Sequence, residues 1–176
     1  MPIPYFLESF LFDWGRDVAP RVAIVPDARL VPDLDQQVDA LFQPGWDNRT
    51  TVLVERMPNP SGDAGPAVPP FARIVADTSN RVVVAAGAAA KGGYLVLLDS
   101  YSPDWQVSVD GRPADMVQAN GLFRAVRLVP GRHLVAFVYR PRALVWGAAV
   151  SGTALTVVLG FLVWPRPRRM IADNLS

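Results

Sequence analysis

The chain has 176 residues, of which 51% are hydrophobic and 19% are charged, which is typical of one folded domain rather than a disordered segment. It contains no cysteine, so disulfide frameworks and thiolate metal sites are excluded. The net charge is +1, but the charges are unevenly distributed: residues 1–115 contain 9 basic and 15 acidic side chains, and residues 116–176 contain 8 basic and 1 acidic. The basic side chains are dispersed along strand-like runs or flank an apolar run. This distribution indicates contact with a membrane surface and not with nucleic acid.

Residues 1–19 are expected to form a leader that precedes the folded domain. They carry a short apolar patch but no basic n-region, so they do not form a secretory signal. Residues 20–140 alternate short apolar runs with turn residues, which predicts a mainly β domain, an antiparallel β-sandwich or jelly roll. The expected strands are 21–25, 51–55, 71–77, 80–86, 94–99, 105–109, 122–128 and 133–139.

One short helix is expected at residues 34–42, where Val38, Leu41 and Phe42 fall on one face. Residues 57–70 are rich in Pro and Gly, which predicts an exposed loop.

Two further turns are indicated by Gly-containing dipeptides. Asp110-Gly111 is typical of a tight hairpin turn. Pro130-Gly131 is expected to join residues 122–128 and 133–139 as an antiparallel pair.

Residues 141–165 are expected to form a single C-terminal transmembrane helix. Ala143 to Trp164 is a run of 22 residues without a charge, and as a helix it would span about 33 Å, enough for a bilayer core. The residues expected to anchor it at the two interfaces are Arg140, Arg142, Trp146, Trp164, Arg166, Arg168 and Arg169. A buried core helix is the alternative, but such helices rarely contain so long an apolar run.

Gly152, Thr156 and Gly160 recur at every fourth position of this run, so they could form a face on which other transmembrane helices pack. Three Arg follow the span and two precede it, which predicts that residues 166–176 form a basic cytoplasmic tail. The β domain would then be extracytoplasmic, although no signal for its export is visible. The chain is therefore either the C-terminal piece of a longer membrane protein or a tail-anchored structural or interaction protein with a cytosolic domain.

No catalytic motif, metal site or cofactor site is expected in this chain. His133, the single histidine, begins a strand and is interpreted as a strand-edge residue. Asp99 and Asp104 flank a turn, and as paired carboxylates they raise the possibility of a glycoside hydrolase. A sheet corner is the simpler interpretation, because Asp, Ser and Pro are common turn residues. A third interpretation is contact with a saccharide, for which the candidate residues are Asp99, Tyr101, Asp104, Trp105 and Asn120.

An ordered series of motifs before the apolar run resembles the C-terminal end of the YfhO family of bacterial multi-spanning membrane proteins. The series comprises a hydrophobic strand ending in Asp99, the Tyr-Ser-Pro-Asp-Trp corner, the Val-Asp-Gly hairpin, "ANGLFRAV", "PGRH" and "YRP". The resemblance covers residues 20–164. Ser102, Asp104 and Gly121 depart from the family's usual residues, which puts any ligand of this loop in doubt.

The resemblance implies a parent protein similar to membrane glycosyltransferases, which transfer sugars from lipid carriers to cell-envelope polymers. In such enzymes the catalytic acid lies near the first membrane spans, so no catalytic residue is assigned here. This chain is expected to supply a non-catalytic extracytoplasmic β domain and a late transmembrane helix in the bacterial cytoplasmic membrane. Its expected partners are the lipid bilayer, other transmembrane helices of the parent protein, and a saccharide or lipid-linked sugar.

Overall fold

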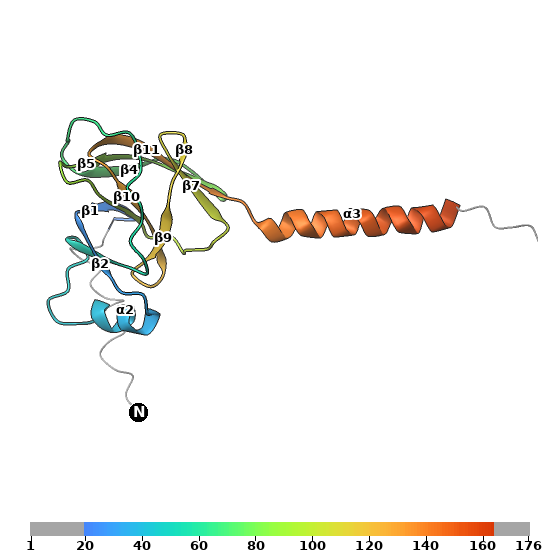
Figure 1. Cartoon of the computed structure of the whole chain (residues 1–176), viewed down its shortest axis with the longest axis horizontal. Helices are drawn as coiled ribbons and strands as arrows, with labels where there is room; N and C mark the ends of the chain where they lie inside the picture. Colours follow the sequence, from blue (N-terminus) through green and yellow to red (C-terminus); the bar gives the residue numbers. More distant parts are fainter. Residues whose placement is uncertain (1–19, 164–176) are drawn as a thin grey trace, which may run out of the picture. The chain divides into compact units, whose positions relative to one another are not determined.

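The computed structural model describes residues 20–163, without the side chains of residues 142–146, 148–150 and 161–163. The chain divides at Pro141 into two compact units, of which the first holds a β domain and the second a helix (Figure 1). The strands are β1 (Val22–Val25), β2 (Asp27–Leu30), β3 (Thr51–Val54), β4 (Phe71–Thr78), β5 (Arg81–Ala88), β6 (Gly93–Leu97), β7 (Trp105–Val109), β8 (Arg112–Pro113), β9 (Met116–Ala119), β10 (Phe123–Leu128) and β11 (Gly131–Tyr139). The helices are α2 (Leu34–Leu41) and α3 (Arg142–Val163).

The strands form two sheets, which confirms the prediction of a mainly β domain with one short helix. Sheet A has the order β1-β6-β10-β9-β3-β2, and sheet B has the order β4-β5-β11-β7-β8. Every expected strand is present, with ends within two residues of the predicted ones. β2, β8 and β9 were not predicted.

The main core lies between the two sheets. β11 and β5 contribute Phe137, Val135 and Val84 from sheet B, and β6 contributes Leu95 and Leu97 from sheet A, all fully buried. Alternate residues of β11 from Gly131 to Phe137 are buried and those between them are more exposed, as expected for a strand with one face on a core.

Sheet A also has a small core on its other face. β2 follows β1 after the single residue Pro26, pairs in parallel with β3 and approaches β6. Sheet A therefore curls back on itself and encloses residues such as Val54, Val96 and Val117. The parallel β2–β3 pair departs from the fully antiparallel sandwich expected from the sequence.

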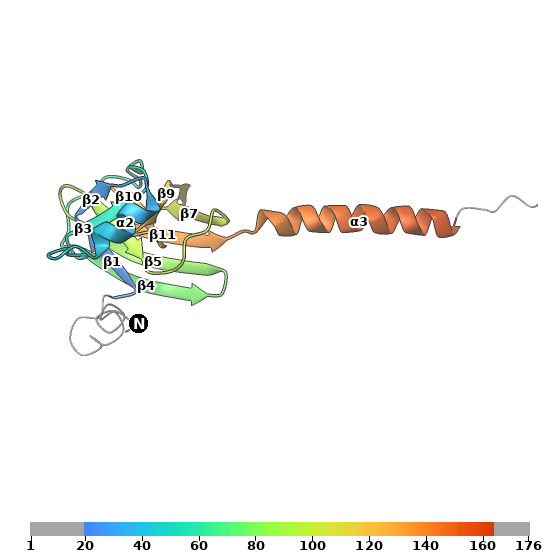
Figure 2. The same ribbon diagram turned by 90° about the horizontal axis from the view of Figure 1, so that it is seen from below.

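Helix α2 begins after Asp33, whose Oδ1 accepts a hydrogen bond of 2.9 Å from the backbone N–H of Gln36. The expected apolar face does not hold this helix in place, since Val38 and Phe42 are 41% and 45% exposed. The buried residue is Gln37, whose side chain donates to Val31 O (2.6 Å) and accepts from Gly121 N (2.8 Å). Polar contacts therefore fasten α2 beside sheet A (Figure 2).

One of the two predicted hairpins is confirmed and the other is wrong. Asp110 and Gly111 have φ angles of 53° and 80°, as a two-residue turn requires, and they join β7 to β8. β10 and β11 do not pair, because β10 lies in sheet A between β6 and β9 and β11 lies in sheet B between β5 and β7. The Pro130-Gly131 turn therefore carries the chain from one sheet to the other.

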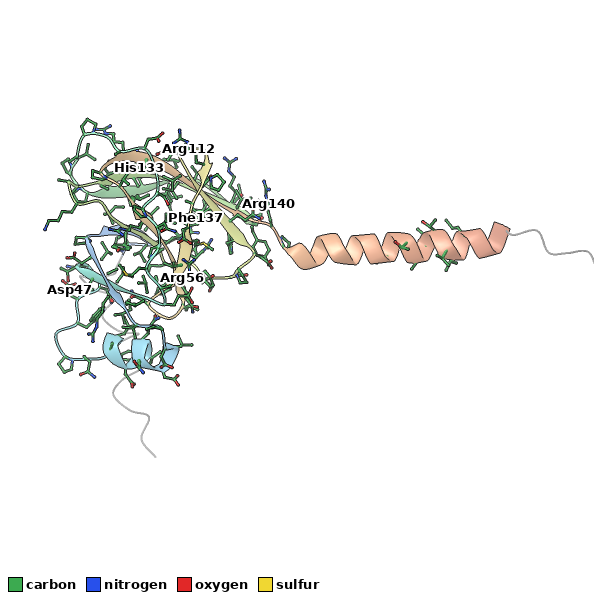
Figure 3. The ribbon with its side chains drawn as sticks, viewed as in Figure 1. Asp47, Arg56, Arg112, His133, Phe137 and Arg140 are labelled. Atoms are coloured by element: carbon green, nitrogen blue, oxygen red, sulfur yellow. The ribbon has the colours of Figure 1, made fainter. Side chains whose placement is uncertain are left out.

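His133 is not a strand-edge residue. It lies on β11, inside sheet B, and its side chain is fully buried. Its Nδ1 is 2.8 Å from Asp110 Oδ2 and its Nε2 is 2.9 Å from Val129 O. Figure 3 shows His133 at the opposite end of β11 from Arg140.

The Pro/Gly-rich segment 57–70 runs against the β domain. Ser61 exchanges backbone hydrogen bonds with Arg127 and Val129, and Gly65 N donates to Pro130 O (2.8 Å). The segment contains one isolated bridge and no strand, as its Pro and Gly content predicts.

Helix α3 comprises 22 residues, Arg142–Val163. Its side chains at residues 151–160 are all exposed. Within the part of the chain that the structure describes, no helix combines the length and the hydropathy needed to cross a membrane. The transmembrane helix expected at residues 141–165 therefore stays a prediction.

Candidate functional site

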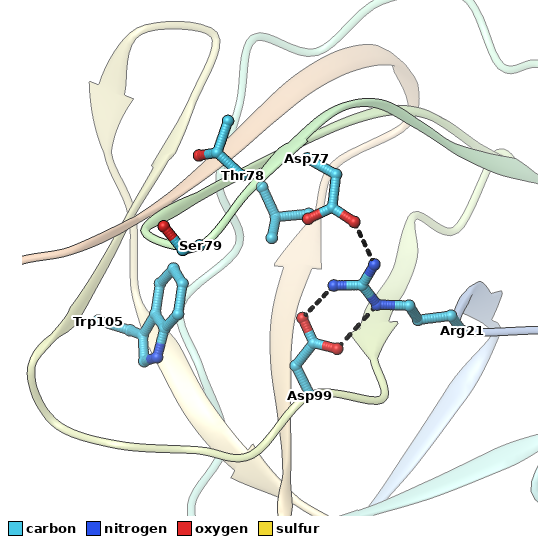
Figure 4. Close-up of a pocket in the computed structure, with 7 residues that line it drawn as sticks. Arg21, Asp77, Thr78, Ser79, Asp99 and Trp105 are labelled. Atoms are coloured by element: carbon cyan, nitrogen blue, oxygen red, sulfur yellow. Dashed lines mark hydrogen bonds and ion pairs between the residues drawn. The ribbon is translucent and has the colours of Figure 1, made fainter.

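A polar pocket of about 450 Å³ opens at one end of the β domain. Four segments build it: the residue before β1, the β4–β5 hairpin, the residues after β6 and the first residue of β7. Its lining residues are Arg21, Asp77, Thr78, Ser79, Val82, Asp99 and Trp105. Figure 4 shows Trp105 opposite Arg21, with Asp77 and Asp99 between them on the two remaining sides.

Arg21 is held by two carboxylates. Its Nε and Nη2 donate to the two oxygens of Asp99 at 2.8 and 2.9 Å, and its Nη1 donates to Asp77. The bidentate pair with Asp99 fixes the plane of the guanidinium. Arg21 thereby ties the start of β1 to the ends of β4 and β6.

Arg124 on β10 approaches the same carboxylate from the interior. Its side chain is 2% exposed, and its Nη2 donates to Asp99 Oδ2 at 3.0 Å. Its guanidinium carbon lies 3.9 Å from the centroid of the Trp105 ring, a distance at which the cation is attracted to the ring face. Its Nη1 is buried without a hydrogen-bond partner among the described residues.

These ion pairs govern the protonation of the site. Hydrogen bonds from Arg21 lower the pKa of Asp99 against the opposing effect of burial, and those to Asp99 and Asp77 raise the pKa of Arg21. Burial lowers the pKa of Arg124, and the nearby Asp99 opposes that effect. The site therefore combines Arg21, Asp77 and Asp99 of the pocket lining with the buried Arg124 behind them.

The structure brings together two of the five residues expected to contact a saccharide. Asp99 and Trp105 line the pocket, whereas Tyr101, Asp104 and Asn120 do not. Asn120 instead has a backbone role, because its Oδ1 accepts from Leu53 N at 2.8 Å. Asp104 O accepts from Arg140 N at 2.9 Å and so fastens the corner to the end of β11.

Tyr101 fixes the same corner through its backbone, since its N–H donates to Leu122 O at 2.7 Å. Sequence reasoning missed Arg21, Asp77, Thr78, Ser79 and Arg124. The local signal for Arg124 is a charged residue directly between Phe123 and Ala125, but Arg127 in the same strand has a similar pattern around it.

Asp99 and Asp104 do not form the carboxylate pair that a glycoside hydrolase needs. A glycoside hydrolase needs one carboxylic acid with a raised pKa, whereas the pKa of Asp99 is lowered. Asp104 does not line the pocket beside it. No group of three or more His, Cys, Asp or Glu residues in the described segments could hold a metal ion.

The residues expected at the membrane lie mostly outside the described side chains. Arg140 is exposed at the end of β11, and the side chains of Arg142 and Trp146 are not described. Trp164, Arg166, Arg168 and Arg169 lie outside the described residues.

The predicted packing face of α3, formed by Gly152, Thr156 and Gly160, lies within the described part of the chain. The Thr156 hydroxyl donates to Gly152 O at 2.8 Å within the helix. A Cβ added at Gly152 or Gly160 would meet nothing within 4 Å. Packing of other helices on this face stays a prediction.

The fold and the pocket define a two-sheet β domain with an end-on polar pocket, followed in the chain by an apolar helix. Residues 72–151 match the model of the family described as bacterial membrane protein YfhO, which confirms the resemblance over β5 to β11, most of β4 and the first part of α3. No curated protein and no solved structure gives a match.

Proposed function

We propose that this chain is a non-catalytic, membrane-anchored β domain of a YfhO-like multi-spanning membrane protein. In this proposal α3 crosses the bacterial cytoplasmic membrane and the β domain lies on the extracytoplasmic side. The domain supports the transfer of a sugar from a lipid carrier to a cell-envelope polymer, and the parent protein supplies the catalytic groups.

The family match carries this proposal, because it runs without a break from β4 through the pocket corner and into α3. The matched residues include most of the pocket lining, from Asp77 to Trp105, but not Arg21. The transfer of sugars is what resemblance to that family implies.

The surface of α3 supports a membrane location. Leu155, Val157, Val158 and Leu159 are each more than half exposed. In addition, the uncharged run from Ala143 to Trp164 is long enough for a bilayer core. Exposed apolar side chains on every side of a helix are stable in lipid or against other apolar helices. The three Arg beyond Trp164, against two before Ala143, favour an extracytoplasmic β domain.

Deletion of residues 20–140 from the chromosomal gene tests the supporting role. We expect the envelope polymer to lose its sugar substituents while the remaining protein stays in the membrane fraction, as judged by immunoblotting. Full glycosylation by the deleted protein would contradict the proposed function. The Asp63→Asn protein is a matched full-length control. The Asp63 carboxylate forms an ion pair with the exposed Arg112, and neither residue lines the pocket.

A further inference from the structure

Both ends of the β domain meet the pocket. Arg21, which precedes β1, lines it. Tyr139, the last residue of β11, packs on Trp105 with ring centroids 5.3 Å apart. Tyr139 N also donates to Asn80 O (2.8 Å) in the β4–β5 turn. The chain therefore enters and leaves the domain beside the same pocket. In the sequence, only Arg140 and Pro141 lie between Tyr139 and the first residue of α3.

We propose that this pocket binds one neutral sugar ring, which stacks on Trp105 and donates hydroxyl hydrogen bonds to Asp77. The sugar's source as a lipid-linked donor rests on the proposed function, whereas the binding itself does not. The argument has three parts: the aromatic platform, the balance of charge and the lone pairs that remain free.

Trp105 has the properties of a fixed platform. Arg124 lies against its ring at 3.9 Å and Tyr139 packs at 5.3 Å, so the indole is held in one orientation. An aromatic surface with a few polar groups around it is typical of small-molecule sites of about 300–1,000 Å³, and the volume of about 450 Å³ falls within this range.

The charges favour a neutral ligand over an ionic one. Arg21 and Arg124 balance Asp77 and Asp99, and each of the four takes part in an ion pair. A charged ligand would therefore find every counter-charge of the site already engaged in an ion pair. Sugar hydroxyls need only unused lone pairs or a hydroxyl group. The Ser79 hydroxyl lies in the pocket lining, whereas the Thr78 hydroxyl is already directed at Asn80 Oδ1 and Arg81 O, at 3.2 Å each.

The free lone pairs lie mainly on Asp77. Asp99 already accepts three N–H groups, from Arg21 Nε, Arg21 Nη2 and Arg124 Nη2, and an ionised carboxylate offers about four acceptor positions. Among the described contacts Asp77 accepts only from Arg21, and its side chain is 44% exposed. Asp77 is therefore the acceptor for the sugar, and Asp99 is a positioning residue that holds Arg21 and Arg124.

Saturation-transfer NMR tests the binding with the full chain in phosphatidylglycerol nanodiscs free of sugar-based detergent. The probes are the methyl glycosides of glucose, galactose and N-acetylglucosamine, with glucuronate and glucosamine as charged counterparts. We expect at least one neutral glycoside to bind more tightly than both charged sugars. Failure of every neutral probe to bind, or equal binding of the charged sugars, would overturn the proposal.

Two variants locate the binding. Asp77→Asn should weaken it about tenfold or more, because a hydrogen bond to a charged acceptor is lost. Ser79→Phe should abolish it by filling the pocket from an exposed turn. Asp63→Asn, which breaks the exposed ion pair with Arg112, should leave it unchanged. Wild-type affinity in both Asp77→Asn and Ser79→Phe would contradict the assignment.

The source of the sugar is tested in the same nanodiscs with added glucosyl polyisoprenyl phosphate. Competition with methyl glucoside in the wild type supports a lipid-linked sugar. Binding of the methyl glycoside without competition supports the pocket and contradicts the lipid source. A cytosolic β domain that still binds the glycoside would overturn the proposed function and leave this inference intact.

Discussion

The guanidinium carbon of Arg124 lies 3.9 Å from the centroid of the Trp105 ring, while its Nη2 donates to Asp99 at 3.0 Å. A buried cation on β10 of sheet A thus supports an aromatic side chain on β7 of sheet B. This contact joins the two sheets beside the pocket, so the residue that stabilises the sandwich also supports the aromatic ring of the proposed sugar site.

Arg124→Met should lower the free energy of unfolding of the β domain by about 2 kcal/mol. Methionine fills much of the space but cannot donate to Asp99 or attract the Trp105 ring as a cation. Urea unfolding followed by circular dichroism measures the change. Arg127→Met on the same strand is the matched control, since Arg127 is only partly buried, and it should change stability by less than about 1 kcal/mol. Equal effects of the two substitutions would contradict the special role of Arg124.

The Asp99 carboxylate should make the domain sensitive to acid. Arg21 lowers its folded-state pKa below the usual 3.8, so its contribution to stability is complete well above pH 3.8 and is lost as the pH falls through the folded-state pKa. We expect the melting temperature of Asp99→Asn to be lower than that of the wild type at pH 7, and the difference to shrink between about pH 5 and pH 2. Parallel pH profiles of the two proteins would show that Asp99 is not the titrating group.

His133→Leu should destabilise the domain by about 2–4 kcal/mol, because the fully buried side chain would lose its polar contacts with Asp110 Oδ2 and Val129 O. Thermal unfolding of the full chain measures this loss. A strand-edge histidine would tolerate the same change with little effect, so a melting temperature equal to that of the wild type would contradict the buried role.

Two glycines with positive φ should differ in their response to alanine. Gly111 has φ +80° and open space around its Cα, so Gly111→Ala should cost about 1 kcal/mol through the backbone alone. Gly62 has φ +101°, and a Cβ there would lie 2.6 Å from His133 Nδ1, so Gly62→Ala should cost clearly more. Urea unfolding of the two variants ranks them, and the reverse order would contradict the docking of residues 57–70 against His133.

Local sequence patterns predicted the strands and turns better than they predicted which strands pair with each other. Short apolar runs bounded by turn residues indicated each long strand, and Asp110-Gly111 indicated its hairpin because the conformation depends on two adjacent residues. Pro130-Gly131 carries an equally strong turn signal, but a turn cannot show whether the next strand joins the same sheet. β8 is only two residues long and β2 pairs in parallel with a distant strand, so neither has a local pattern to detect.

Only the part of the pocket that is formed by residues close together in the sequence was predicted. Asp99 and Trp105 lie close together in the sequence and share one corner, so their proximity could be expected. Arg21 and Arg124 are brought to that corner by the pairing of β1 with β6 and of β6 with β10. Asp77 reaches it from β4 of sheet B, which packs against β1. Asn120 was assigned to the sugar because an exposed Asn and a structural Asn have the same appearance in a sequence.

The membrane topology is tested most directly by cysteine labelling, since the chain contains no cysteine of its own. Lys91→Cys places one thiol on an exposed turn of the β domain, and Ser176→Cys places one at the other end of the predicted span. In intact cells, a membrane-impermeant maleimide should label Lys91→Cys, and Ser176→Cys should react only after permeabilisation. Labelling of Ser176→Cys with protection of Lys91→Cys, or protection of both thiols until the cells are opened, would contradict an extracytoplasmic β domain anchored by α3.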